Sequence, residues 1–240
     1  MEPRLRRASA ALLAAVLLTS PACGGADGVG ERPLRVLFVG NSLTATNDLA
    51  SVVRALAAEA GRRPIETQMV APGGVSLEEH WRSTGARQAL DEGRWDVVVL
   101  QQGPSTLPGS RAHLRTWTRR WADEARAHGA RPALLGAWTE AARREALQGA
   151  IDSHAEAASA SDATLLPVAA AWRAALRRDS RLELYGPDGF HPSQLGTRLA
   201  ALVVYAGLTG ADPARLPLEV DDTVAPVLRA AAAEALAATG

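Results

Sequence analysis

The stretch Val36-Leu37-Phe38-Val39-Gly40-Asn41-Ser42-Leu43-Thr44 places a serine three residues beyond a short apolar run. Residues 34–39 are largely apolar and favour β-structure, which predicts a buried parallel strand. A helical pattern follows at 47–60, where the apolar side chains lie on one face. The stretch therefore predicts a strand, a turn and a helix, with Ser42 in the turn.

The same alternation of strand and helix continues along the chain. Further strands are expected at 64–70, 95–100, 131–137 and 163–168, and further helices at 112–128, 139–160, 169–177, 193–208 and 223–238. This pattern predicts an α/β protein, a three-layer α/β/α sandwich around a five-stranded parallel sheet. Functional groups in such sheets lie at the carboxyl ends of the strands, where Ser42 and Gln101 are expected.

A second motif, Asp188-Gly189-Phe190-His191-Pro192, lies far downstream. A serine hydroxyl is a weak nucleophile until an imidazole takes its proton, and a carboxylate usually orients that imidazole. We therefore interpret Ser42 as a nucleophile, His191 as its general base and acid, and Asp188 as the orienting group. The alternatives are structural: Ser42 as a helix N-cap, His191 as a cap of the following helix, and Asp188 as an ordinary turn residue.

Three segments carry a resemblance to a known family: Gly40-Asn41-Ser42-Leu43, Ala71-Pro72-Gly73-Gly74 and Asp188 to His191. From residue 34 to 210 the chain resembles the SGNH (GDSL-type) hydrolases. Where that family usually has Gly-x-Asn-Asp, this chain has Leu100-Gln101-Gln102-Gly103-Pro104-Ser105, similar to a bacterial branch with Gln. The resemblance implies a flavodoxin-like fold, a Ser-His-Asp triad and carboxylic ester substrates, often acetyl esters of carbohydrates, without metal or organic cofactor.

An oxyanion hole needs two or three donors about 3 Å from the developing charge. The backbone N–H groups of Ser42 and Gly74 are the first two candidates, since glycine lets the main chain approach a ligand closely. The third is a side-chain amide. Gln101 and Gln102 compete for this place, since alternation at a strand end puts the two on opposite sides, and Gln101 is favoured. The hydroxyl of Ser105 is a poorer fixed donor.

The remaining histidines and two tryptophans have simpler interpretations. His113, His128 and His154 are expected at the surface of helices, whereas His80 could line the site. Trp81 and Trp138 could each form a wall for a sugar ring or acyl group, but the expected role is packing.

Composition limits the class of function. The 240 residues are 47% hydrophobic and 22% charged, with no lysine and a formal net charge of zero, so there is no electrostatic case for nucleic-acid binding. One cysteine excludes an internal disulfide, and no paired Cys/His spacing suggests a metal. The Gly-x-Ser-x-Gly motif of α/β-hydrolases is absent.

Residues 1–23 resemble an export signal, because three arginines precede an apolar segment at 8–18 that is too short to span a membrane. Cys23 follows a small residue, as at a bacterial lipoprotein acylation site, which would tether the protein to a membrane; the alternative is simple secretion after cleavage. Residues 24–33 are expected to be a flexible linker and 34–240 the hydrolase domain.

The sequence therefore predicts an exported serine esterase, located in the periplasm, on the cell surface or in the medium. Two alternatives stay open. One is a surface-attached carbohydrate-binding module with little catalysis, and the other is a sugar O-acyltransferase that uses the same three residues.

Overall fold

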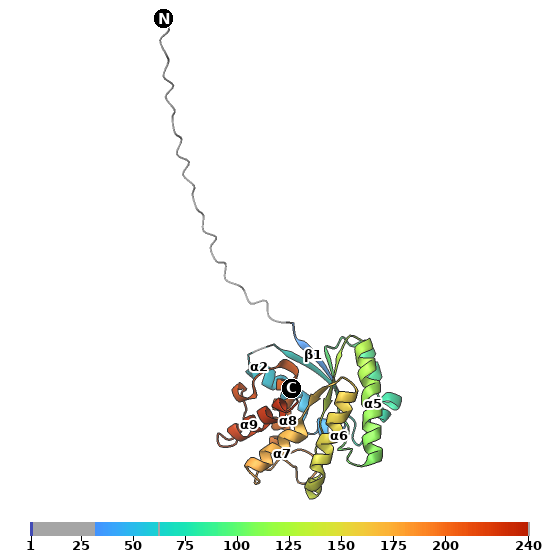
Figure 1. Ribbon diagram of the computed structural model, residues 1–240, viewed down its shortest axis with the longest axis vertical. Coiled ribbons are helices and arrows are strands. Elements are labelled where there is room, and N and C mark those ends of the chain that lie inside the picture. Colours follow the sequence, from blue (N-terminus) through green and yellow to red (C-terminus); the bar gives the residue numbers. More distant parts are fainter. Residues whose placement is uncertain (2–31, 62, 240) are drawn as a thin grey trace. The chain divides into compact units, whose positions relative to one another are not determined.

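The computed structural model describes Met1, residues 32–61 and residues 63–239 (Figure 1). Cys23, nearly all of the expected export signal and most of the expected linker lie outside the described residues. The expectations for these segments therefore remain predictions.

Five parallel strands form one sheet in the order β2-β1-β3-β4-β5. The strands are β1 (Leu34–Val39), β2 (Ile65–Val70), β3 (Val97–Leu100), β4 (Arg131–Leu135) and β5 (Thr164–Leu166). Val39, the last residue of β1, pairs with Val70 and Leu100, the last residues of its two neighbours. The segments that follow these three strands therefore leave the sheet at one edge, where the chain reverses its strand order.

Helices cover both faces of this sheet (Figure 1). One layer contains α2 (Leu49–Glu59), α7 (Val168–Arg178), α8 (Gln194–Thr209) and α9 (Ala225–Ala237). The other contains α3 (Leu77–Ser83), α4 (Ala86–Glu92), α5 (Pro108–Ala127) and α6 (Leu147–Ala160). The predicted three-layer α/β/α architecture is confirmed.

The two layers explain why β1 is apolar at nearly every position. Val36 and Phe38 belong to the core on the α8 side, whereas Leu37 and Val39 belong to the core on the α5 side. A strand that is buried on both faces reads as a continuous apolar run. The side chain after such a strand emerges at a rigid edge, which is where Ser42 lies.

The expected element ends differ from the observed ones in a few places. The helix expected from residue 112 begins at Pro108, because proline fits the first turn of a helix. The segment expected to be helical from 139 begins with a 3₁₀ segment, Ala141–Ala146, before α6. Helices α3 and α4 were not predicted, since each has only seven residues and too few turns for a clear period.

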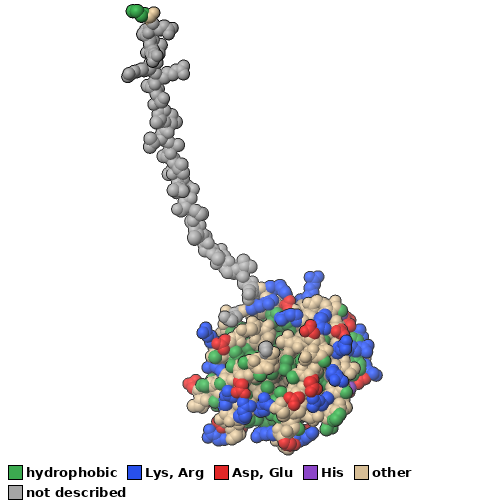
Figure 2. All heavy atoms as spheres, in the orientation of Figure 1, with side chains coloured by type: hydrophobic (Ala, Val, Ile, Leu, Met, Phe, Trp, Pro, Cys, Tyr) green, Lys and Arg blue, Asp and Glu red, His purple; other side chains and the backbone are tan. Residues whose placement is uncertain are grey.

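Charged side chains of both signs are interspersed over the face shown in Figure 2. Many of the arginines form ion pairs, for example Arg82 with Glu78 at 2.6 Å and Arg111 with Glu156 at 2.7 Å. Among the helices of the described residues, none combines the length and the apolar character that crossing a membrane would require.

Candidate active site

A short helix, α1 (Ser42–Ala45), begins directly after the strand-ending turn of β1. Asn41 is its N-cap, because the Asn41 Oδ1 atom accepts a hydrogen bond from the Leu43 N–H at 3.1 Å. The capping alternative for Ser42 is therefore wrong. Ser42 is half-buried, and its N–H belongs to the first helical turn, where backbone donors have no intrahelical acceptor.

The structure brings Ser42, His191 and Asp188 together, although Ser42 and His191 are 149 residues apart in sequence. The His191 Nε2 atom lies 2.9 Å from the Ser42 Oγ atom, and the His191 Nδ1 atom lies 2.5 Å from the Asp188 Oδ2 atom. A carboxylate can only accept from Nδ1–H, which leaves the Nε2 lone pair free to accept the Ser42 proton. This tautomer is the one that a general base requires.

The turn that contains Asp188 and His191 orients the carboxylate. The Asp188 Oδ1 atom accepts hydrogen bonds from the backbone N–H groups of Phe190 and His191, each at 3.0 Å. Gly189, which lies between Asp188 and Phe190, has φ of 69°, a conformation that favours glycine. These bonds, the one to the His191 imidazole first, lower the pKa of Asp188 to about 2.

A pair of antiparallel segments closes the base of this turn. The Gly186 N–H donates to the His191 carbonyl at 2.7 Å, and Tyr185 forms an isolated bridge with Pro192. The following helix α8 is capped by Ser193, whose Oγ atom accepts from the Gly196 N–H at 3.0 Å. His191 therefore does not cap α8, and the capping alternative for it is wrong as well.

Asn47 joins the segment that contains Ser42 to the segment after His191, a role that was not predicted. Its Nδ2 atom donates to the Pro192 carbonyl and to the Thr197 Oγ1 atom, both at 2.9 Å. Its Oδ1 atom accepts from the Gln194 Nε2 atom at 2.9 Å. Asn47 has φ of 58°, a conformation that asparagine tolerates better than most residues. In the sequence, the only hint of this role was an asparagine at the start of a predicted helix.

Trp138 contacts the turn that contains Asp188 and His191. It stacks on Trp172 with ring centroids 4.1 Å apart, and its indole N–H donates to the Phe190 carbonyl at 3.0 Å. Trp81 packs edge-on against Trp121 at 5.4 Å. The prediction that both tryptophans pack is confirmed, and Trp138 also holds the backbone beside His191.

Gln101 contacts the turn that precedes Ser42 and the short helix that begins there. Its Oε1 atom accepts hydrogen bonds from the Asn41 N–H at 2.8 Å and from the Thr44 Oγ1 atom at 2.9 Å. Because Asn41 N–H can only donate, the amide oxygen must face it. The Gln101 Nε2 atom is buried and has no hydrogen-bond partner among the described residues.

Gln102 attaches to a different part of the site, as strand alternation predicted. Its Oε1 atom accepts from the Leu77 N–H at the start of α3 at 3.1 Å, and its Nε2 atom lies 3.4 Å from the Ser105 Oγ atom. The Ser105 hydroxyl donates to the Gly103 carbonyl at 2.9 Å, within its own loop. The side-chain amide of Gln102 is therefore already engaged at both ends.

Gly74 lies in the exposed loop between β2 and α3 and has φ of 73°. The Asn41 Nδ2 atom donates to the carbonyl of Val75, the next residue, at 3.1 Å. This bond ties the Gly74 loop to the residue that precedes Ser42. The two expected backbone donors, Ser42 N–H and Gly74 N–H, are thus carried by two segments that are linked directly.

Comparison with solved structures decides the family. A protein from Slackia heliotrinireducens assigned to the SGNH hydrolases matches with a TM-score of 0.64 and 30% sequence identity, over 74% of this chain and 100% of that one. The chain belongs to the SGNH hydrolase family. It is therefore an ester-hydrolysing enzyme, and the predicted family is confirmed.

Two structures of lower sequence identity share the fold of this SGNH hydrolase. A DUF4886 family protein from Bacteroides uniformis matches with a TM-score of 0.69 and 18% identity, over 85% of this chain and 95% of that one. The acetyl xylan esterase AlAXEase matches with a TM-score of 0.61 and 14% identity, over 73% of this chain and 100% of that one. No protein-family model and no curated protein matches the sequence.

A cavity of about 1000 Å³ adjoins the His191 side of the site in this SGNH hydrolase. Asp188 and His191 form part of its wall, together with Asn47, Arg144 and Tyr185. Arg144 lies over the Tyr185 ring, 5.4 Å from the ring centroid. The cavity is large enough for a ligand of several rings, and the His191 imidazole forms part of its wall.

His154 of the hydrolase is not at the surface, so that prediction is wrong. It lies on the buried face of α6, and its Nδ1 atom is 2.8 Å from the Ala150 carbonyl oxygen. Burial lowers the pKa of His154 to about 4. His128 is exposed, as predicted, and lies 3.1 Å from the Asp91 carboxylate. His113 is half-buried and lies 2.9 Å from the Glu78 carboxylate.

We expect His154 to make the stability of the hydrolase depend on pH. Its folded pKa of about 4 lies below its ordinary 6.5, so the unfolded chain binds the extra proton between these values. Stability contributed by the neutral imidazole is therefore lost as the pH falls from 6.5 to 4, by about 3 kcal/mol at 1.36 kcal/mol per pKa unit. Urea unfolding of wild type and His154→Leu at pH 7.5 and 4.5 measures this, with His128→Gln as the control. An equal pH dependence in wild type and His154→Leu would refute it.

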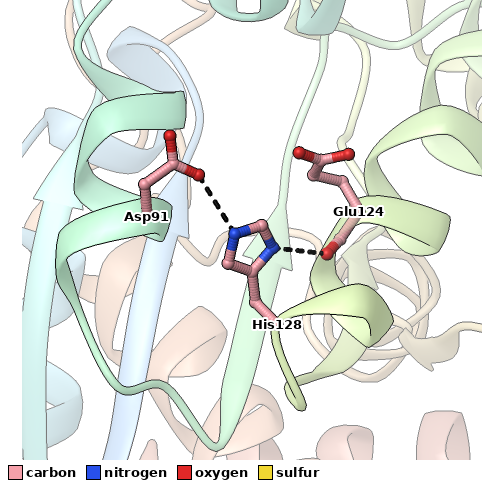
Figure 3. Close-up of side chains that lie close together, drawn as sticks. All are labelled: Asp91, Glu124 and His128. Carbon is pink, nitrogen blue, oxygen red and sulfur yellow. Dashed lines mark hydrogen bonds and ion pairs between the residues drawn. The ribbon is translucent and has the colours of Figure 1, made fainter.

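One group of side chains in the described residues could hold a metal ion: Asp91, Glu124 and His128, with ligand atoms within 4.8 Å of one another (Figure 3). It lies at the ends of α4 and α5 that lead into β3 and β4, at the opposite edge of the sheet from Ser42. The His128 Nδ1 atom already contacts the Glu124 backbone carbonyl at 2.9 Å (Figure 3). This group takes no part in the site around Ser42.

Proposed function

We propose that the hydrolase is a serine esterase that acts through Ser42, His191 and Asp188. The observation that carries the proposal is the unbroken line of hydrogen bonds from Asp188 through His191 to Ser42, at 2.5 Å and 2.9 Å. The line ends on a half-buried hydroxyl at the head of a helix, where an ester carbonyl can reach it.

The steps follow from the tautomer of His191. As the Ser42 Oγ atom bonds to the ester carbonyl carbon, the His191 Nε2 atom takes the hydroxyl proton. The imidazolium then returns this proton to the leaving alcohol, and a covalent acyl-serine remains. Water then gives a proton to the same Nε2 atom as its oxygen bonds to the acyl carbon. The bond from that carbon to the Ser42 Oγ atom breaks, Oγ takes the proton back from Nε2, and the acid is released. Asp188 stays ionised throughout and stabilises the imidazolium.

Three groups are proposed to hold the oxyanion: the N–H of Ser42, the N–H of Gly74 and the side-chain amide of Gln101. The first two lie on linked segments, as described above. Gln101 is preferred over Gln102 because its amide nitrogen has no partner among the described residues, whereas both ends of the Gln102 amide are engaged.

We expect Gln101→Leu to lower kcat by about 10²–10³-fold, the usual cost of an oxyanion donor. Gln102→Leu should cost less, because it removes a support of α3 and not a donor. Steady-state kinetics with p-nitrophenyl acetate measure both. A silent Gln101→Leu together with an impaired Gln102→Leu would reverse the assignment.

For the substrate we propose acetyl esters of carbohydrates. The cavity that has His191 in its wall gives room for a bulky alcohol near the imidazole. The fold is shared with an acetyl xylan esterase, which suggests the class but does not select the sugar.

The test compares acetylated glycans with p-nitrophenyl esters of increasing acyl length, each with and without a free sugar acceptor. We expect acetate release from the glycans, a rate that falls as the acyl chain lengthens, and no dependence on the acceptor. Product that forms only with the acceptor would favour the O-acyltransferase. Glycan binding without any turnover would favour the binding module. Export and lipid attachment at Cys23 remain proposals from the sequence.

A further inference from the structure

The peptide unit between Gly40 and Asn41, one unit before the peptide that carries the Ser42 N–H, is held at both ends by side chains from other segments. Its N–H donates to the Gln101 Oε1 atom at 2.8 Å. Its carbonyl oxygen lies 2.6 Å from the His80 Nε2 atom. A rotation of this peptide would break both bonds, so its orientation is fixed by α3 and by the residue that directly follows β3.

His80 can serve this purpose because its ring nitrogens have partners that place the N–H on the side of Gly40. The side chain is fully buried, and burial lowers its pKa, so the imidazole is neutral at neutral pH. The Gly40 carbonyl can only accept, which places the single proton on Nε2. The Nδ1 atom is then the acceptor for the Thr84 hydroxyl, 2.9 Å away.

The space around this peptide is filled. A Cβ atom at Gly40 would lie 2.6 Å from the Thr44 Oγ1 atom and 2.8 Å from the Gln101 Oε1 atom, closer than side-chain atoms approach. The glycine is thus required by packing, although its φ is not positive. The peptide has no room to move toward Gln101, and His80 holds it from the side of α3.

His80 also connects the two segments that carry the backbone donors. It lies on α3, which begins three residues after Gly74. Asn41 forms the second connection through its bond to the Val75 carbonyl. The unit made of the Gly74 loop and α3 is therefore attached to the Ser42 turn at two points, Val75 to Asn41 and His80 to Gly40.

We propose that His80 is a positioning residue of the esterase: its Nε2–H sets the orientation of the Gly40–Asn41 peptide and the spacing between the N–H groups of Ser42 and Gly74. It touches no reacting atom and acts through the oxyanion donors. The inference rests on the proposed function, since His80 would position the backbone groups that are proposed to hold the oxyanion.

The test compares His80→Phe, which keeps a planar ring but removes the donor, with His80→Gln, whose amide N–H can occupy the place of Nε2–H. We expect His80→Phe to lower kcat for p-nitrophenyl acetate by about 10–100-fold with KM within about threefold, since small misplacements at a reacting centre cost up to about 10²-fold. His80→Gln should recover kcat to within about fivefold of wild type, because a donor to Gly40 is restored.

A control separates positioning from stability. Leu90→Ala removes a fully buried side chain of α4 in the same core and should lower the urea midpoint without lowering kcat of the folded enzyme. If His80→Phe does not fold, Thr84→Val gives the same information more weakly, with an expected loss of about two- to fivefold in kcat.

The outcomes are distinguishable. An active wild type with unchanged kcat in His80→Phe and Thr84→Val overturns this inference and leaves the esterase intact. The same holds if His80→Gln fails to recover kcat, or if Leu90→Ala lowers kcat as much as His80→Phe. A wild type that neither hydrolyses esters nor reacts with a fluorophosphonate overturns the proposed function, and this inference with it.

Discussion

Ser42→Ala and His191→Ala are each expected to lower kcat by about 10⁴–10⁶-fold, with the double variant no slower than the worse single one. The reason is that the two groups act as a unit: without Ser42 there is no acyl acceptor, and without His191 the hydroxyl keeps its proton. Steady-state hydrolysis of p-nitrophenyl acetate by the three variants measures the effect.

Matched controls for this experiment are available on α5 and at its end. Ser110→Ala and His128→Gln change the same residue types away from the site and should keep kcat within about twofold, as surface changes usually do. Circular dichroism and urea unfolding establish that each variant is folded. Multiplicative effects of Ser42→Ala and His191→Ala would show that the two residues do not act together.

Asp188→Asn is expected to lower kcat by about 10²–10⁴-fold with little change in KM. An asparagine amide can donate to Nδ1, which moves the imidazole proton to Nε2 and removes the acceptor for Ser42. The upper end of the range applies to a buried aspartate, whereas the Asp188 side chain is 51% exposed, so we expect a value nearer the lower end. The pH–rate profiles of wild type and Asp188→Asn provide the measurement.

The pH dependence of this contact follows from the direction of the Asp188 shift. Its folded pKa of about 2 lies below the ordinary 3.8, so the ionised contact is fully present above pH 3.8 and is lost as the pH falls toward 2. Protonation of Asp188 therefore cannot cause a loss of activity between pH 4 and 7. If the pH–rate profiles of wild type and Asp188→Asn had the same shape and the same kcat between pH 4 and 7, Asp188 would not be the group that orients His191.

The sequence predicted the elements whose signal is local. β1 was predicted with its observed ends because a strand buried on both faces is apolar at nearly every position. Ser42, Asp188 and His191 could be found because each lies in a short motif next to a predicted strand end, turn or helix start. The parallel topology brings these three residues to one edge of the sheet, and the alternation of strands and helices predicted that topology.

The residues that support the site could not be predicted in the same way. Asn47 acts through a left-handed backbone conformation and bonds to partners about 150 positions away. His80 acts from a seven-residue helix that gave no periodic signal. His154 was placed at the surface because α6 mixes polar and small residues, and alanines such as Ala150 and Ala157 do not mark which face of a helix is buried.

The central claim is that Ser42 is a nucleophile activated by His191, and covalent labelling tests it most directly. The purified enzyme is treated with a fluorophosphonate probe, digested and mapped by mass spectrometry, alongside Ser42→Ala and His191→Ala. We predict one modified residue, Ser42, no labelling of Ser42→Ala and labelling of His191→Ala slowed by at least about 10³-fold. Wild type that does not label, or Ser42→Ala that labels as fast as wild type, would contradict the account.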